Sequence, residues 1–247
     1  MKKISLLVAL LPTLALANPI YTPTQNEIKV IEMLFNDDVD GYINDSGESL
    51  IAEKLAIVNA TADELLVEYS ANELRADKKF KGKEIFIKGT VSAIKSDVRD
   101  EPYVEIKTKH RFYTPQARFI KSEEDKVIEL NKGDKLKLFC KGAGELAGIP
   151  LLSDCVFSTT KSEQIKNELV SEYEQLLKGD IDGVSKKIRE LAYFVNILSR
   201  TFNDFKSCDK QGISNDCLSK LLTAENVKKA KEKHKEDPLI EYLKIKK

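Results

Sequence analysis

Apolar and polar residues alternate along the middle of the chain, from residue 83 to residue 157. Between residues 83 and 94, Ile85, Ile87 and Val91 fall on one face, whereas Lys88 and Thr90 fall on the other. This period of two is typical of a half-buried strand. Gly89 interrupts it, and a glycine at such a place predicts a bulge or sharp coil that lets one strand serve both sheets of a small barrel. The pattern predicts strand, strand, strand, helix, strand, strand, over residues 83–94, 103–108, 110–119, 122–130, 135–141 and 151–157.

A capped helix is predicted just before the first of these strands. Thr61 and Glu64 form a capping box. In this motif the threonine hydroxyl accepts from the Glu64 backbone amide, and the Glu64 carboxylate accepts from the Thr61 backbone amide. Apolar residues then recur at helical spacing as far as Phe80, and Gly82 ends the pattern. We expect this helix to lie against the barrel.

The region before the capped helix is acidic and helical in pattern, over residues 27–35 and 50–58. Between these stretches, residues 36–44 match part of a calcium-binding loop, with Asp38, Asp40 and Gly41 at matching positions. Position twelve, which normally holds a bidentate glutamate, is Gly47, and Glu48 comes one place late. We therefore favour a structural turn over a calcium site, because short Asp, Asn and Gly residues are also common in turns.

Beyond residue 159 the pattern is almost wholly helical. Helices are predicted over residues 162–178 and 183–206, and a third helix should begin at Ser214. The lysine-rich run of residues 228–235 carries compensating glutamates and is interpreted as a solvated helix face.

The first 17 residues have the features of a secretory signal peptide: Lys2 and Lys3, an apolar run, and Ala15-Leu16-Ala17 as a cleavage signal. A membrane anchor would need about 20 apolar residues, and the run is shorter. We expect a periplasmic or secreted protein with no membrane span after cleavage.

Composition is that of an ordinary globular protein, with 42% hydrophobic and 32% charged residues and a formal net charge of zero. The charge is unevenly distributed, because residues 18–74 carry 2 basic and 12 acidic side chains, and residues 75–155 carry 18 basic and 13 acidic ones. Either the two parts pack on each other, which we favour, or the basic part meets an anionic partner.

Four cysteines in an exported chain predict disulfides. We expect Cys140 to pair with Cys155 on adjacent strands, and Cys208 to pair with Cys217 across the turn before the third C-terminal helix. A zinc site of four thiolates is the alternative, but the cysteines are too widely spaced for its usual paired motifs.

Catalytic motifs are absent from the sequence. The two histidines, His110 and His234, lie beside no obvious nucleophile or metal partner, and no phosphate-binding, nucleophile-elbow or zinc-protease motif occurs. We therefore expect no enzymatic activity, no cofactor and no metal site.

The predicted strand order is that of the OB-fold, a five-stranded barrel. A set of residues between 61 and 157 carries a further signal: Leu65, Leu66, Tyr69, Asn72, Glu73, Ala76, Asp77, Phe80 to Lys83, Gly89 to Val91, Ile94, Gly133, Asp134, Cys140, Gly142, Asp154 and Cys155. In these residues the segment resembles the bacterial tRNA_anti-like family of exported OB-fold proteins. The resemblance implies the fold and leaves the ligand open. The chain departs from the family pattern in its larger helical tail and in lacking a cysteine in the third strand.

The expected fold class is α+β, with an OB-fold barrel flanked by an N-terminal helical segment and a C-terminal all-helical region. The expected divisions are residues 1–17, 18–60, 61–158 and 159–247, for signal peptide, acidic helical segment, barrel and helical region.

Two functions from different classes remain open. The favoured hypothesis is a non-enzymatic interaction module that binds a protein or envelope component, with the aromatics of the third strand partly buried under helices. The alternative is a binder of single-stranded nucleic acid or oligosaccharide, because OB-folds bind such ligands over the second and third strands. The candidate ligand-binding residues on those strands are Tyr103, Lys107, Lys109, Arg111, Phe112, Tyr113 and Arg118, accompanied by His110 and Phe119.

Overall fold

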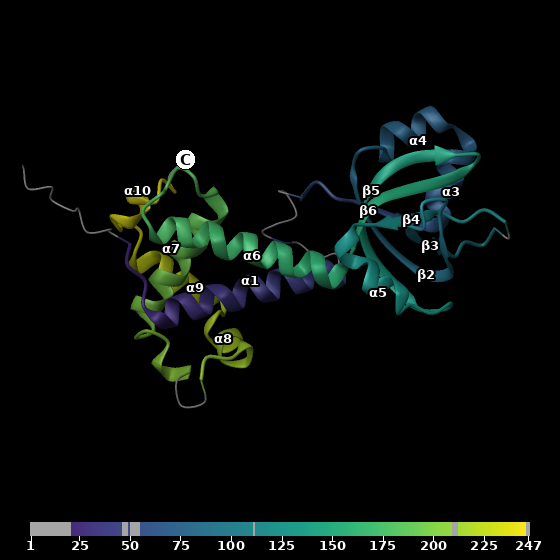
Figure 1. Cartoon of the computed structure of the whole chain (residues 1–247). Helices are drawn as coiled ribbons and strands as arrows, with labels where there is room; N and C mark the ends of the chain where they lie inside the picture. The colour runs from purple at the N-terminus through teal and green to yellow at the C-terminus, as the bar shows by residue number, and fades with distance from the viewer. Residues whose placement is uncertain (1–20, 46–48, 50–54, 111, 209–211, 246–247) are drawn as a thin grey trace, which may run out of the picture. The chain divides into compact units, whose positions relative to one another are not determined.

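The computed structural model describes residues 21–45, 49, 55–110, 112–208 and 212–245. The predicted signal peptide, Arg111, Gly47 and Glu48 lie outside these residues. The chain divides into two compact units, one of residues 31–171 and one of residues 1–30 with 172–247. Each unit is described separately below, with the element labels of Figure 1.

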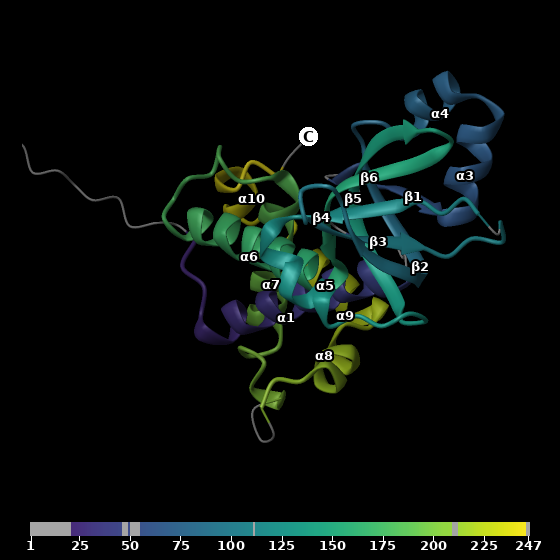
Figure 2. The ribbon, with the colours of Figure 1, turned by 45° about the vertical axis from the view of Figure 1, so that its right-hand side comes forward.

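The first unit contains a closed five-stranded barrel (Figures 1 and 2). The sheet order is β2-β3-β4-β6-β5, and β5 pairs back onto β2. Only the β4–β6 pair within the barrel is parallel. This is the connectivity predicted from the sequence, so the α+β class and the OB-fold are confirmed. The five strands are β2 (Glu84–Ser96), β3 (Pro102–Ile106), β4 (Gln116–Phe119), β5 (Lys135–Leu146) and β6 (Ile149–Phe157).

The long strand β2 closes the barrel by changing partners along its length. Residues 84–90 pair with β5 and residues 91–96 with β3. A Cβ atom added at Gly89 would lie 2.3 Å from Cγ2 of Ile106, so glycine permits close packing at the point of change. The shift in register lies between Val91 and Ala93 rather than at Gly89, which corrects the predicted position of the bulge.

Two other features of the barrel differ from the prediction. Val58 was expected to end a helix, but it begins a sixth strand, β1 (Val58–Thr61), which pairs in parallel with β2. The rest of that expected helix falls mostly outside the described residues. The third barrel strand was predicted over residues 110–119, yet β4 begins only at Gln116, and residues 107–110 and 112–115 lie in a loop.

The predicted helix after Thr61 is two helices, α3 (Ala62–Ala71) and α4 (Glu73–Phe80). The Thr61 hydroxyl accepts a hydrogen bond from the Glu64 amide at 3.1 Å, which confirms the predicted helix start. Asn72 has extended backbone angles and its Oδ1 accepts from the Arg75 amide at 3.0 Å, so it ends one helix and caps the next. Both helices supply side chains to the barrel core, as expected.

The barrel core is apolar and contains one of the two disulfides. Cys140 on β5 and Cys155 on β6 are bonded and buried, as predicted. Between β4 and β5 the chain forms η1 (Lys121–Glu123) and α5 (Glu124–Ile128), which match the helix expected between the third and fourth strands. Val127 of α5 is fully buried in the same core.

Helix α1 (Gln25–Asp45) runs without a break through residues 36–44. Both earlier interpretations of this segment, a turn and a calcium loop, are therefore wrong. Phe35, Val39 and Ile43 recur at intervals of four residues and are buried, which explains why the segment stays helical. On the same stretch, Asp40 forms an ion pair with Lys166 of α6 (Ser158–Leu177) at 2.8 Å.

The second unit is helical. Helix α7 (Lys186–Thr201) ends earlier than predicted, because Asn203, Asp204 and Phe205 have positive φ values. Ser214 caps the next helix, as expected, and its hydroxyl accepts from the Cys217 amide at 3.4 Å. The remaining elements are η2 (Lys206–Cys208), α8 (Asn215–Leu221), α9 (Ala224–Lys233) and α10 (Leu239–Tyr242).

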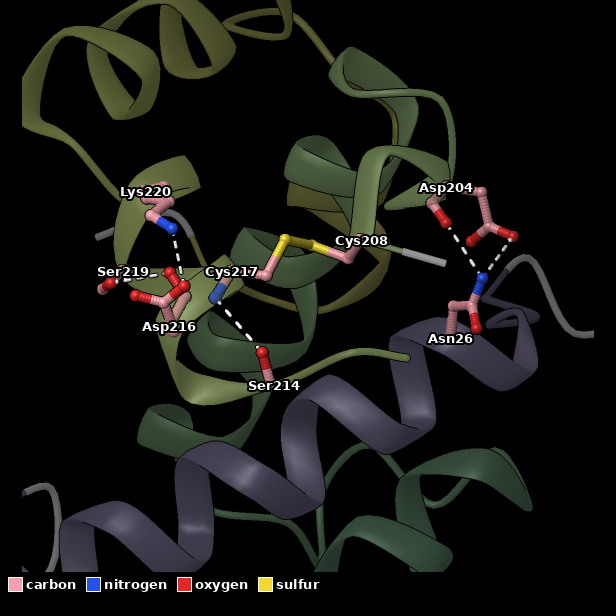
Figure 3. Close-up of a disulfide and its surroundings, with 8 residues drawn as sticks. All are labelled: Asn26, Asp204, Cys208, Ser214, Asp216, Cys217, Ser219 and Lys220. Carbon is pink, nitrogen blue, oxygen red and sulfur yellow. Dashed lines mark hydrogen bonds and ion pairs between the residues drawn. A yellow bond between two sulfur atoms is a disulfide. The ribbon is translucent and has the colours of Figure 1, made fainter. Parts of the chain in front are cut away.

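The predicted disulfide between Cys208 and Cys217 is present in this unit (Figure 3). Asp204 lies four residues before Cys208, and its backbone carbonyl accepts a hydrogen bond from the Asn26 side chain of α1 at 2.9 Å. All four cysteines are paired, so the zinc alternative is wrong. Across the residues that the structure describes, no helix is long and apolar enough to cross a membrane.

Candidate interaction surface

The outer face of β3 and β4 is where an OB-fold ligand was expected. Tyr103 and Arg118 lie directly opposite each other on these strands. The Arg118 guanidinium lies 5.7 Å from the centre of the Tyr103 ring, within the range of a cation–π contact. The structure therefore brings two of the predicted ligand-binding residues together.

Arg118 already has a carboxylate partner. Its Nη1 lies 2.5 Å from Oδ2 of Asp97, in the turn that joins β2 to β3. The Asp97 carboxylate also accepts from the backbone amides of Arg99 and Glu101. The hydrogen bond from the Arg99 amide lowers the pKa of Asp97 most and that from Arg118 lowers it further, so that the pKa is about 2 although burial opposes the shift. At neutral pH Asp97 is fully ionised and offsets the Arg118 charge.

A second cation on this face is paired in the same way. Lys95 of β2 donates to Glu105 of β3 at 2.7 Å, and this contact raises the pKa of the lysine. The strand face thus carries matched charges instead of the bare cations that a phosphate backbone would require.

The other predicted residues that the structure describes lie in the loop formed by residues 107–110 and 112–115, here called the aromatic loop. Two polar side chains organise it. The Thr108 hydroxyl, which is buried, lies within hydrogen-bonding distance of the Tyr113 carbonyl at 2.8 Å and the His110 carbonyl at 3.1 Å. Nδ1 of His110 accepts from the Phe112 and Tyr113 amides at 3.2 and 3.1 Å. His110 is therefore a structural residue of the loop.

This arrangement displays the aromatic side chains to solvent. Phe112 is 77% exposed and Tyr113 is 43% exposed. The expectation that these aromatics are partly buried under helices is therefore wrong for Phe112. The hydrogen bonds of Thr108 and His110 hold the backbone at residues 110, 112 and 113, and the Phe112 ring lies outside the barrel.

The aromatic loop meets two neighbouring elements of the barrel unit. The Lys109 amide donates to Asp63 in the first turn of α3 at 2.7 Å. At the tip of the β5–β6 hairpin, a Cβ atom added to Gly148 would lie 3.5 Å from the Tyr113 ring. Leu146, at the end of β5, is 69% exposed. The aromatic loop and this hairpin tip together form an exposed surface with apolar and aromatic side chains.

The remaining predicted residues are placed as follows. Lys107 and Lys109 are exposed on the aromatic loop, and Phe119 stacks on Phe157 at 5.2 Å between ring centres. The structure therefore separates the predicted set into a strand pair and a loop group.

Sequence reasoning missed the residues that neutralise the strand face and those of the hairpin tip. The Asp97-Val98-Arg99-Asp100 run is typical of a turn in which the aspartate binds its own backbone, so the role of Asp97 was readable in part. Nothing local to the sequence indicated that Asp97 would reach Arg118, 21 residues away.

A concave site of about 310 Å³ also lies beside β1 in this unit. Its lining is chemically mixed and comprises Asn59, Ala60, Thr61, Glu64, Phe86 and Lys88. Among the described residues, no group of three or more His, Cys, Asp or Glu side chains could hold a metal ion.

Comparison with solved structures finds a lipoprotein from Klebsiella pneumoniae subsp. pneumoniae MGH 78578 that has been proposed to bind nucleic acid. It is 16% identical, with a TM-score of 0.36, and the match covers 45% of this chain and 97% of that one. No curated protein matches the chain. The family model described as tRNA_anti-like matches residues 1–156, which is more than half of the 247 residues. With its closed OB barrel, the chain belongs to the tRNA_anti-like family.

Proposed function

We propose that the protein is a non-enzymatic OB-fold binding module that works outside the cytoplasm and holds a protein or envelope component. The aromatic loop and the hairpin tip make the contact. The observation that carries this proposal is the contrast between the two surfaces of the barrel: the strand face has its cations paired, whereas the loop displays Phe112 and Tyr113.

Exposed aromatic side chains on a braced loop suit a protein interface. Aromatic residues are enriched among the residues that dominate binding energy, and a fixed backbone reduces the entropy lost on association. The hydrogen bonds of Thr108 and His110 provide that bracing. The two disulfides and the signal-like leader support a location in an oxidising compartment.

A second candidate function is the binding of single-stranded nucleic acid. The aromatic loop favours it because Lys107 and Lys109 accompany the exposed Phe112, a combination that can neutralise phosphates and stack on bases. The paired charges of Arg118 and Lys95 count against it, since breaking those ion pairs would offset part of the gain from phosphate contacts.

A titration with labelled single-stranded DNA and RNA separates the two functions. Our proposal expects no saturable complex tighter than about 10⁻⁴ M at physiological salt. A complex that weakens with salt at a slope near −0.7 per phosphate contact would favour the second candidate. In that case Lys107→Ala with Lys109→Ala should weaken binding, whereas Lys132→Ala, an exposed lysine on the loop before β5, should leave it unchanged.

A further inference from the structure

The helical unit contains a pocket of about 440 Å³ between α7, α9 and the C-terminal segment. Its wall is formed mostly by apolar and aromatic side chains: Tyr193, Phe194, Ile197, Ile240 and Ile245. A volume of this size falls within the usual range for small-molecule sites, and such a lining is typical of them. The pocket belongs to a different unit from the aromatic loop and shares no residue with it.

Hydrogen bonds across the unit hold the walls of this pocket in place. The Tyr193 hydroxyl of α7 donates to the His234 carbonyl at the end of α9 at 2.7 Å. Nη1 of Arg189, on the same helix α7, donates to the Leu243 carbonyl at 2.8 Å. Leu239 and Leu243 are buried, which anchors α10. These contacts hold the walls of the cavity in place, so little ordering should be needed for binding.

The pocket is lined by three charged residues, one acidic and two basic: Glu190, Lys231 and Lys235. The Glu190 carboxylate lies 3.6 Å from Nζ of Lys186, so its charge is already compensated. Lys231 and Lys235 are exposed, and neither forms an ion pair with any described residue. Two uncommitted ammonium groups thus stand beside an apolar cavity.

We propose that this pocket binds a single-chain amphiphilic anion. The chain occupies the apolar cavity, and Lys231 and Lys235 bind the carboxylate or phosphate head. An anionic head satisfies both lysines by charge-assisted hydrogen bonds, whereas a neutral or cationic head does not. The cavity accommodates one chain, so the ligand is a monomeric amphiphile such as a fatty acid and not a bilayer surface.

Isothermal titration of the full chain with dodecanoate and with dodecyl phosphate, both below their micellar concentrations, tests the proposal. Saturable one-to-one binding is expected for both. Dodecyl maltoside and dodecyltrimethylammonium, which carry the same twelve-carbon chain, should bind at least about tenfold more weakly because their head groups cannot form ion pairs with the lysines. Equal binding of all four would overturn the assignment of the lysines.

Matched variants localise the site. Lys231→Glu with Lys235→Glu should weaken dodecanoate binding by at least about tenfold, since both charge-assisted contacts become repulsive. The control is Lys229→Glu with Lys233→Glu, which has the same spacing and charge change on exposed positions that do not line the pocket. Ile240→Trp should reduce binding by filling the cavity. The proposal fails if control and test variants behave alike, or if neither dodecanoate nor dodecyl phosphate binds.

Discussion

The carboxylate of Asp97 lies 2.5 Å from the guanidinium of Arg118, across the face on which OB-folds commonly bind their ligands. Among the described residues of the predicted ligand-binding set, Arg118 is the one cation that lies on a strand of that face. Because its charge is balanced within the barrel, the face offers little net attraction for a polyanion. This pairing directs attention from the strands to the aromatic loop.

Asp97 should make the barrel sensitive to acid. The pKa of Asp97 in the folded protein is about 2, lower than the ordinary value of 3.8. Its contribution to the free energy of unfolding is therefore fully present above pH 3.8 and is lost as the pH falls towards 2. Asp97→Asn should therefore show a smaller loss of stability between pH 4 and pH 2 than the natural protein. Urea unfolding at a series of pH values measures this difference, and parallel curves for the two proteins would contradict it.

A substitution at Gly41 tests whether helix α1 is continuous through residues 36–44. Gly41 lies inside the helix, and a Cβ atom added there would meet nothing within 4 Å. Gly41→Ala should therefore stabilise the protein by roughly 0.5–1 kcal/mol, the usual gain within a helix. Gly142→Ala is the contrasting variant, because its Cβ would lie 2.2 Å from the Phe80 carbonyl oxygen. It should destabilise by about 1–3 kcal/mol. Denaturant unfolding measures both, and destabilisation by Gly41→Ala would support a turn at residues 36–44.

The Cys140–Cys155 disulfide should contribute substantially to the stability of the barrel. Its removal by Cys140→Ala with Cys155→Ala should cost on the order of 3 kcal/mol, the value for a loop of about 15 residues. Unfolding followed by circular dichroism measures this loss. Thiol labelling of denatured, unreduced natural protein should modify no cysteine, and labelling of two or more would refute the disulfide framework.

Protonation of His234 should lower the stability of the helical unit at mildly acidic pH. Burial lowers its pKa below the ordinary 6.5, and the nearby Arg200 and Lys233 add to this effect, while Asp237 opposes it. The folded state thus favours the neutral imidazole. The contribution of His234 to stability is therefore fully present above pH 6.5 and is lost as the pH falls below that value.

His234→Gln should remove this acid-side loss, which thermal unfolding between pH 7 and pH 5 can detect. Burial raises the pKa of Glu27 in the same unit, and that group acts in the opposite direction, so only the difference between the two proteins is informative. An identical pH dependence in both would exclude His234 as the cause.

The sequence predicted those features that local chemistry determines. The hydroxyl cap of Thr61, the strand order and the pairing of Cys140 with Cys155 are all present in the structure, although the Glu64 carboxylate pairs with Lys79. Residues 36–44 were misread because Asp, Asn and Gly favour turns locally. The buried stripe of Phe35, Val39 and Ile43 prevails over that preference through packing.

The candidate site was predictable in composition but not in arrangement. The aromatic and basic residues were identified, yet their division between a strand pair and a loop depends on tertiary contacts. Asp97 is distant from Arg118 in sequence, and Gly148 is distant from Tyr113. Alternation alone could not show that the described residues of the aromatic loop leave the sheet, because the hydrogen bonds of Thr108 and His110 form only within the folded loop.

The central claim is that the aromatic loop is the surface that contacts a partner. Site-specific photocrosslinking in the organism that encodes the protein tests it most directly. A photoreactive phenylalanine analogue replaces Phe112 in one variant. In the control variant it replaces Leu74, a residue of α4 that is 82% exposed. Thermal unfolding of Phe112→Ala checks that a change at this position does not unfold the barrel, and its midpoint should be unchanged because the Phe112 ring is exposed. The account predicts a discrete crosslinked adduct from position 112 and none from position 74. No adduct from position 112, or equal adducts from both positions, would contradict it.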